Sequence, residues 1–358
     1  MYASLGFETL TAPQAAVWLG ALLGLAFGAA AAVSRFCLRR GLVSGPERGA
    51  ALAVWAAGLA VAVTGTQAAV AAGLVEFGAH RFHAAELPVL AVLLGGALFG
   101  AGMVLTRGCP SRLLVLGAGG NLRALAVILV FALAAHATLK GLLAPARVAL
   151  GGVTVPLGDV ASLGALPGGG LAGAALLAAG ALALAWRARA RPRDLALGAL
   201  IGALVPAGWV GTGHVLFDDF DPVALESLSF TAPAADSLFF VIASTAVPAN
   251  FGVGLLAGTF AGAFLAAVLR REARWESFET PRQTGRYALG AGLMGVGGVL
   301  AGGCTVGAGL SGVATLGVSA LLALAAIVVG ARATDTLLTR GGAGSAAPSA
   351  TRRALPAE

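Results

Sequence analysis

Long apolar segments alternate with short polar ones along almost the entire chain. Many of the apolar segments hold roughly 20 residues with almost no charge, which is enough for a helix to cross the ~30 Å hydrocarbon core of a membrane. The pattern predicts an all-α polytopic membrane protein with about nine transmembrane helices. The predicted spans cover residues 15–33, 50–75, 88–106, 122–143, 168–186, 195 to the acidic loop at 218–221, 237–269, 287–302 and 313–330.

Two segments depart from this simple pattern. Residues 144–165 are weakly apolar and rich in glycine, so we expect them to lie at the membrane interface rather than to cross the membrane. Residues 237–269 are too long for one span and are interrupted at Pro248-Ala-Asn-Phe251, which favours a broken or re-entrant piece followed by a full crossing. We therefore expect short re-entrant helices beside the long ones.

The composition agrees with a membrane protein and excludes a soluble one. Hydrophobic residues make up 58% of the chain and charged residues 11%, and 54 of the 358 residues are glycine. The glycines recur with the spacing G-x-x-x-G at positions 20, 24 and 28 and again at positions 254, 258 and 262. This spacing is typical of helix faces that pack closely inside a membrane. The chain is expected to be a single integral membrane domain.

The basic residues are distributed unevenly between the two sets of loops. All but three of the 23 Lys and Arg residues belong to the alternate loops that begin at Arg35, Arg107, Arg187, Arg270 and Arg332, the exceptions being Arg81, Lys140 and Arg147. By the positive-inside rule the basic loops are cytoplasmic, which places the N-terminus outside and the C-terminus inside the inner membrane of a bacterium. The net charge of +7 therefore indicates topology, and no nucleic-acid partner is expected.

An internal repeat places two of the three cysteines at matching positions. With an offset of 195 residues, Gly95–Gly117 aligns with Gly290–Gly312, and Cys109 falls on Cys304. In the predicted topology the spans before these two cysteines run in opposite directions, so the copies form an inverted repeat, as in many transporters. The expected halves are residues 15–186 and 194–332, followed by a disordered cytoplasmic tail over residues 333–358.

Three cysteine motifs together carry a resemblance to a known family. They are SRFC at residues 34–37, GMVLTRGCPSR at 102–112 followed by GGNLRAL, and GGCTVGAGLSG at 302–312. In these motifs the chain resembles the YeeE/YedE family of sulfur-compound transporters, whose best-understood members take up thiosulfate. The resemblance implies an hourglass-shaped helical protein with Cys37, Cys109 and Cys304 along the substrate path. It also implies a possible partner, a small cytoplasmic sulfurtransferase of the TusA type.

The chemistry of thiols suits a soft, sulfur-bearing anion. A cysteine buried in apolar surroundings stays protonated, so its S–H can donate weakly while its polarizable sulfur faces the sulfur of the anion. Gly108 and Gly303 precede two of the cysteines and would let backbone N–H groups approach a ligand. Thr305, beside Cys304, and Arg107, on the cytoplasmic side, complete the candidate pathway residues.

Other kinds of site are poorly supported by the sequence. The chain has no C-x-x-C and no Cys/His pair with metal spacing, so no metal, cofactor or catalytic residue is expected, although a disulfide between two cysteines stays open. No Asp or Glu falls inside a predicted span, which disfavours a carboxylate site for protons or sodium. Gly309-Leu-Ser-Gly312 resembles a serine-protease motif, but no histidine follows Ser311 to act as its base.

These observations predict a transporter or channel-like protein, rather than an enzyme, for thiosulfate or a related small sulfur anion. The charge of a dianion must be spread over many weak donors along such a path, which favours a large, polarizable oxyanion over tightly hydrated sulfate. Two alternatives stay open. The cargo could be sulfide, sulfite or a selenium compound, or the protein could be a membrane sulfur-transfer or redox protein whose cysteines form persulfides.

Overall fold

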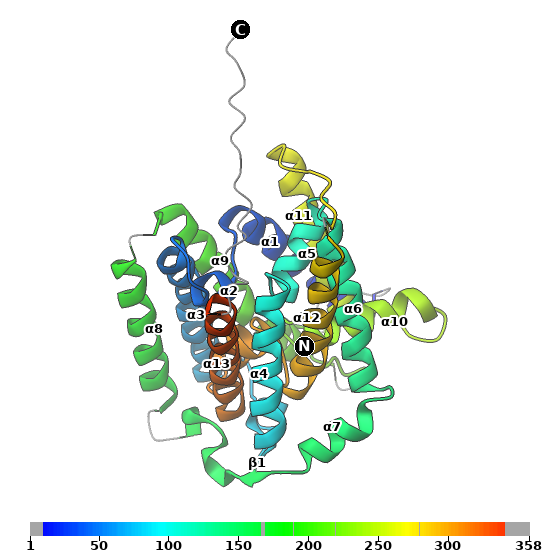
Figure 1. Ribbon diagram of the computed structural model, residues 1–358. Helices are drawn as coiled ribbons and strands as arrows, with labels where there is room; N and C mark the ends of the chain where they lie inside the picture. The colour runs from blue at the N-terminus through cyan, green and yellow to red at the C-terminus, as the bar shows by residue number, and fades with distance from the viewer. Residues whose placement is uncertain (1–9, 166–168, 189, 219, 279, 341–358) are drawn as a thin grey trace.

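The computed structural model describes residues 10–165, 169–188, 190–218, 220–278 and 280–340, which fold almost entirely into helices (Figure 1). Eight helical stretches of this part of the chain are long and apolar enough to cross a membrane. The predicted all-α polytopic fold is therefore confirmed. The long helices are α1 (Ala12–Ser34), α3 (Arg48–Ala71), α4 (Val89–Leu105), α6 (Leu122–Leu139), α8 (Gly169–Arg187), α9 (Pro192–Val210), α11 (Phe251–Leu269), α12 (Pro281–Leu300) and α13 (Val318–Arg340).

Short helices follow several of the long ones. Those that lie within the bundle are α2 (Leu38–Leu42), α5 (Pro110–Ala118) and the π-helical segment η6 (Gly307–Gly312), whereas α10 (Thr231–Ala243) has only its first part buried. At the end of the bundle that holds β1 lie η2 (Arg81–His83), α7 (Ala144–Gly151), η3 (Gly158–Ala161), η4 (Leu163–Ala165) and an antiparallel pair of strands, β1 (Glu86–Leu87) and β2 (Val155–Pro156). The segment expected at the interface, residues 144–165, accordingly forms short elements and no crossing helix.

The long helices pack in matched pairs. The helices α4 and α12, which carry the two copies of the sequence repeat, lie against each other. α4 also packs against α13, the helix that follows the second copy, and α12 packs against α6, the helix that follows the first. Helix α1 packs against α11 and α3 against α9. Each half of the chain therefore buries its apolar faces largely against the other half.

Glycines allow α1 and α11 to cross with their backbones in contact. A Cβ added at Gly24 would overlap the carbonyl oxygen of Leu255, and one added at Gly258 would overlap that of Ala21. The two G-x-x-x-G series therefore interlock with each other; the sequence predicted close-packing faces at both but did not identify them as partners. Because no side chain separates the helices at these points, the contact depends on glycine specifically.

We expect the substitution Gly258→Ala to destabilise the protein. The new methyl group would collide with the backbone of α1, and overpacking of this kind costs ~1–3 kcal/mol. A lower melting temperature of the purified protein in detergent would report the loss. The matched control is Gly180→Ala in α8, where an added Cβ meets no atom within 4 Å and should leave the melting temperature unchanged or slightly raised. Equal melting temperatures for the two variants would contradict the packing argument.

Two boundaries differ from the sequence prediction. The broken segment begins at Thr231 rather than at residue 237, because α10 starts there. The break between α10 and α11 ends at Asn250, whose side-chain oxygen accepts the Val253 amide at 2.9 Å and caps the first turn of α11. Helix α13 continues to Arg340, so residues 333–340, which were expected in a disordered tail, are helical. Residues 341–358 lie outside the described part of the chain.

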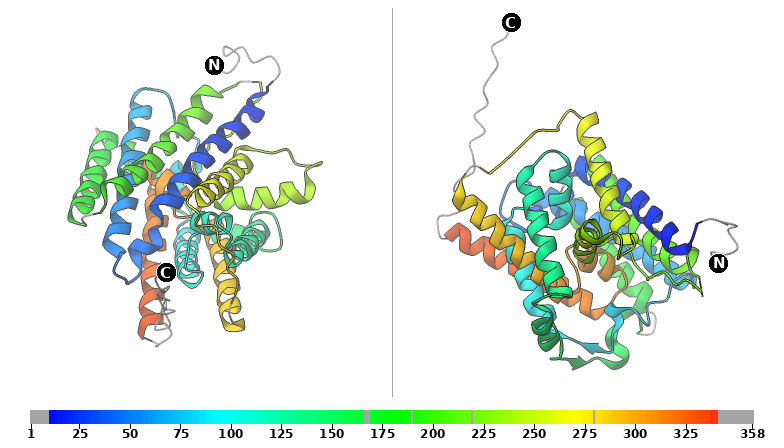
Figure 2. Two further views of the ribbon diagram at one scale, coloured as in Figure 1. Left: turned by 90° about the horizontal axis from the view of Figure 1, so that it is seen from above. Right: turned by 90° about the vertical axis from the view of Figure 1, so that its right-hand side faces the viewer.

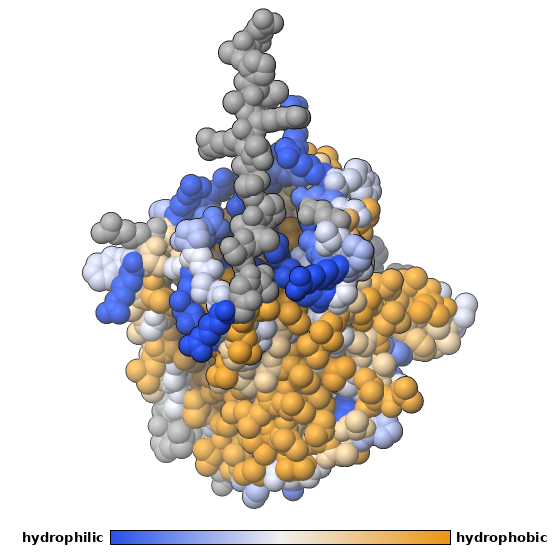
Figure 3. All heavy atoms as spheres, in the orientation of Figure 1, coloured by the Kyte–Doolittle hydropathy of each residue, from blue (hydrophilic) through white to orange (hydrophobic). Residues whose placement is uncertain are grey.

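The surface of the molecule divides into a polar end and a broad apolar region. Hydrophilic residues gather toward the upper end of the view, and apolar side chains cover most of the face below it (Figure 3). Helix α10 runs outward from the bundle (Figures 1 and 2). Its first turn is buried at Thr231 and Pro233, whereas Val241 and Ile242 near its far end are exposed. Such a surface fits a protein surrounded by lipid.

Candidate functional site

The three cysteines occur in the same kind of turn. A long helix ends, one residue adopts a left-handed backbone conformation, and a cysteine two positions later begins a short helix. The left-handed residues are Arg35 (φ 53°), Arg107 (φ 61°) and Gly302 (φ 76°). A positive φ is uncommon for arginine and persists only where the surrounding packing fixes it. The local geometry that places each cysteine is therefore shared by all three motifs.

Each cysteine lies at the start of its short helix and is buried. Cys37 is the N-cap residue of α2 and Cys109 that of α5. Cys304 plays a similar part before η6, because its Sγ accepts the Gly307 amide at 3.3 Å and its carbonyl accepts the Ala308 amide at 2.9 Å. The three are free thiols, each no more than 3% exposed.

The structure brings two of the cysteines and one further predicted residue together. The thiols of Cys37 and Cys109 lie near enough to interact with each other, and the Thr305 hydroxyl also lies near Cys109. The Ser111 hydroxyl is 3.3 Å from the Cys109 sulfur. Three separate turns of the chain therefore meet at Cys109. Cys304, one residue before Thr305, belongs to the same turn and lies near enough to Arg81 to interact with it electrostatically.

The remaining predicted residues surround this cluster. The Gly108 amide donates to the Met103 carbonyl at 3.2 Å, so it is engaged within its own turn. A Cβ on Gly303 would lie 2.7 Å from the Ala308 nitrogen, so the tight turn requires glycine here. The Arg107 side chain is exposed at the polar end, and its carbonyl accepts from Arg39 Nη1 at 3.4 Å.

A fourth entering segment was not anticipated from the sequence. Residues 223–230 dip into the bundle before α10, and Leu228 and Phe230 are buried. The ring of Phe230 lies 5.0 Å from that of Phe27, and the Ser229 hydroxyl is packed against Gly307, where an added Cβ would lie 2.5 Å from it. The available signal was the alternation Ser-Leu-Ser-Phe immediately before a proline-containing helix start, in a segment interpreted as an exposed loop.

A cavity of about 370 Å³ opens beside this fourth segment. Its wall includes Arg81, Glu226, Trp209 and Ser229. The Trp209 indole N–H and the Ser229 hydroxyl are buried and have no hydrogen-bond partner in the described structure. Arg81 lies over the Phe82 ring at 5.1 Å, and no carboxylate of the described residues pairs with it. Unpaired donors and an unpaired cation facing one cavity form an environment suited to an oxyanion.

A smaller space shares part of its wall with this 370 Å³ cavity, called the outer cavity from here on, and part with the cysteine turn. It measures about 30 Å³, and Arg81 and Ser229 line it together with Gly302 and Gly303. The Thr231 hydroxyl at its wall is likewise buried without a partner. Donors without partners therefore continue from the outer cavity to the residues directly before Cys304.

The histidines near the outer cavity are neutral at pH 7. Burial, aided by Arg81 and His83, lowers the pKa of His80 to about 4. Its Nδ1 accepts the Phe82 amide at 3.3 Å, and its ring meets that of Trp209 edge to face at 5.2 Å. Burial also lowers the pKa of His83, whose Nε2 lies 3.1 Å from the Thr315 carbonyl. The positive charge that lines this cavity is therefore that of Arg81.

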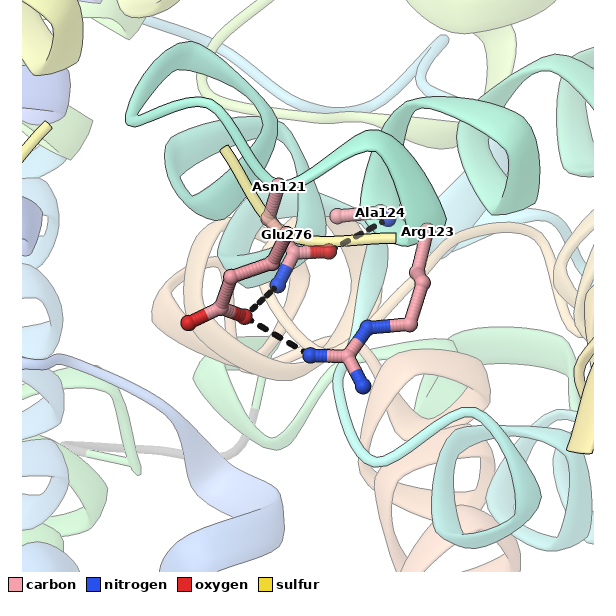
Figure 4. Close-up of polar contacts among 4 residues, drawn as sticks. All are labelled: Asn121, Arg123, Ala124 and Glu276. Carbon is pink, nitrogen blue, oxygen red and sulfur yellow. Dashed lines mark hydrogen bonds and ion pairs between the residues drawn. The ribbon is translucent and has the colours of Figure 1, made fainter. Parts of the chain in front are cut away.

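At the opposite end of the bundle, a second cavity of about 150 Å³ is lined by arginines and by the loop between α11 and α12. Arg112 lies at its wall and also near enough to Cys37 to interact with it electrostatically. Glu276, from the loop between α11 and α12, accepts from Asn121 at 2.5 Å and from Arg123 at 2.7 Å (Figure 4). These bonds fasten that loop to the turn between α5 and α6, beside the cavity.

The serine-protease alternative has no support in this geometry. The Ser311 hydroxyl donates to the Leu228 carbonyl at 2.7 Å. Within the described part of the chain, no hydrogen bond joins Ser311 to a histidine, so the serine lacks the base that a nucleophile needs. Its contact instead holds the segment before α10 against η6.

Short, interrupted helices among apolar spans long enough to cross a membrane are typical of multi-pass membrane transport proteins. A family model described as sulphur transport matches residues 26–333, from α1 to α13, and the chain belongs to this family. The resemblance drawn from the three cysteine motifs is thus confirmed. A search of curated proteins finds no match for the chain.

Proposed function

We propose that this protein takes up thiosulfate across the inner membrane of a bacterium, along a path that passes Cys304, Thr305, Cys109 and Cys37. The observation that carries the proposal is the meeting of Cys109 with Cys37 and Thr305 between two cavities. A thiol beside a hydroxyl offers several weak donors and no fixed charge at the narrowest region. Such donors lower the barrier for an anion without binding it too tightly for release.

The orientation is part of the proposal. The polar end that carries most arginines is assigned to the cytoplasm, with the N-terminus outside and the C-terminus inside. The matched packing of α4 with α13 and of α12 with α6 supports an inverted repeat. The cavity lined by Arg81 would then receive the anion, and the cavity lined by Arg112 would release it. A small sulfurtransferase of the TusA type is the partner proposed at the cytoplasmic end.

The cargo follows from the order of chemical groups along this path. The outer cavity presents a guanidinium and unpaired N–H and O–H donors, which suit the oxygen atoms of an oxyanion. The next groups are thiols, which suit a soft terminal sulfur. Thiosulfate carries both kinds of atom, whereas sulfate carries only oxygen and sulfide only sulfur.

We expect purified protein in liposomes to accumulate radiolabelled thiosulfate at least about tenfold faster than sulfate, the ratio given by ~1.4 kcal/mol of differential stabilisation. Liposomes without protein provide the control for leakage. Equal uptake of the two anions would contradict the selectivity argument. Uptake of neither would redirect the search to sulfide, sulfite and selenium compounds. Labelled sulfur that stays covalently on a cysteine after washing would favour the sulfur-transfer alternative.

A further inference from the structure

Glu226 is a carboxylate that the loop before α10 carries into the outer cavity. The backbone of this residue is fixed to the π-helical turn η5 (Gly211–Val215) that follows α9, because the Thr212 hydroxyl donates to the Glu226 carbonyl at 2.8 Å and accepts the Glu226 amide at 3.1 Å. The neighbouring Ser227 hydroxyl donates to the Val205 carbonyl at 2.8 Å. The Glu226 side chain is half-buried and lines the same cavity as Arg81. Its negative charge therefore stands where an entering anion must pass.

The charged groups around Glu226 come from each side of the cavity. Arg81 of η2 attracts it, and Asp236 of α10 repels it. The exposed Glu76, in the segment after α3, also lines the cavity, and the neutral His80 lies beside Arg81. Cys304 lies near Arg81 on the η6 side. The walls contributed by α9 and α11 are uncharged there, being formed by Trp209 and Phe251.

The balance of these groups raises the pKa of Glu226 above its ordinary value. Burial and the charge of Asp236 raise the pKa of Glu226, and Arg81 only partly opposes them. A divalent anion bound near Arg81 would add two further negative charges and would draw the guanidinium away from the carboxylate. Both effects make a proton on Glu226 more favourable still.

From this arrangement we infer that the outer cavity binds a divalent oxyanion together with one proton, which Glu226 takes from the outer solution. The carboxylate gains the proton and becomes a neutral carboxylic acid, so its repulsion of the anion disappears and its O–H becomes a further donor. The inference rests on the proposed function, since it names the proton as a second species at the same site. The inference assigns the pH dependence of anion binding in the outer cavity to one residue, Glu226.

The sign of the effect follows from linkage. Below the pKa of Glu226 in the empty protein, the acid is already neutral and the anion binds at full affinity. Above that pKa, binding must first draw a proton from solution, so the affinity falls as the pH rises. Thiosulfate remains a dianion over this range, so the anion itself contributes no comparable change.

The test measures thiosulfate binding to the full-length protein by titration calorimetry at about pH 5 and about pH 8, in buffers of different ionisation enthalpy. We expect affinity about tenfold higher at the lower pH, with close to one proton taken up per anion at the higher pH. Glu226→Gln should bind with similar affinity at both pH values and take up no proton. Glu86→Gln, an exposed carboxylate of β1 outside the cavity, is the matched control and should retain the wild-type pH dependence.

A second variant keeps the test decisive if Glu226→Gln folds poorly. Asp236→Asn removes the group that repels Glu226, so the fall in affinity should begin at a lower pH than in the wild type. Thiosulfate uptake and binding that show no pH dependence would overturn the inference and leave the proposed function intact. An unchanged pH profile in Glu226→Gln would also overturn it. Failure of the wild-type protein to bind thiosulfate at any pH would overturn both.

Discussion

Replacing Cys109 with alanine is expected to lower thiosulfate uptake about ten- to hundredfold, the effect of losing one hydrogen bond to a charged group. Cys109 is the point where three turns of the chain meet, so its thiol is the donor shared by all of them. Alanine adds no bulk and leaves the N-cap backbone unchanged, so the protein should still insert and fold. Uptake by proteoliposomes, at matched protein content, measures the change.

Serine at the same position provides the discriminating control. Its hydroxyl replaces the donor but is harder and more strongly hydrated than a thiol, so we expect only partial recovery of uptake. Cys304→Ala should also reduce uptake, because Cys304 belongs to the turn that joins the outer cavity to Cys109. Normal uptake in both single alanine variants, with unchanged melting temperatures, would reduce the cysteines to a packing role.

Replacing Arg81 with glutamine is expected to raise the KM for thiosulfate at least about tenfold, while the maximal rate changes little. The guanidinium supplies the positive charge that lines the outer cavity, and glutamine keeps polar atoms there without that charge. The KM of the wild type should also rise with ionic strength, and that dependence should weaken in the variant.

Arg147→Gln is the matched control for Arg81→Gln. Arg147 belongs to the same set of loops, but its guanidinium is bound to the carbonyls of Thr138 and Leu139 at the end of α6, and Arg147 does not line the outer cavity. Its removal should leave the KM and its salt dependence unchanged. Equal effects of the two substitutions would indicate that only the general surface charge attracts the anion.

The long helices could be predicted because their cause is local. An apolar window of sufficient length must form a helix in lipid, since its backbone groups have no other partners. The close-packing faces of α1 and α11 were visible in the glycine spacing for a similar reason, because only glycine permits such contact. The family could be recognised from three cysteine motifs, each of which specifies a turn with its own short helix.

The surroundings of the candidate site could not be predicted because they depend on how deep each loop lies. A count of charges within predicted spans disfavoured a carboxylate near the path, yet the loop before α10 enters the bundle and carries Glu226 with it. Arg81 was assigned to an ordinary outer loop for the same reason. The repeat matched Cys109 with Cys304, whereas the thiol that interacts with Cys109 is that of Cys37, from the first span. Sequence alignment identifies equivalent positions and not spatial neighbours.

The glycine crossing of α1 and α11 has a mechanical consequence. Where the two backbones touch, sliding one helix along the other would bring a Cα or a carbonyl of one helix into collision with the other. The pair therefore resists such sliding and moves as one rigid unit. Any motion that widens the path must therefore come from elements held by fewer contacts. Helix α10 fits that description at its far end, because its buried residues lie between Thr231 and Ala235 and beyond them it meets α6 through the stacked rings of Phe239 and His136. A small tilt of α10 would shift its first turn beside Ser229, while the α1–α11 pair and Glu226, whose backbone is hydrogen-bonded to Thr212, stayed still.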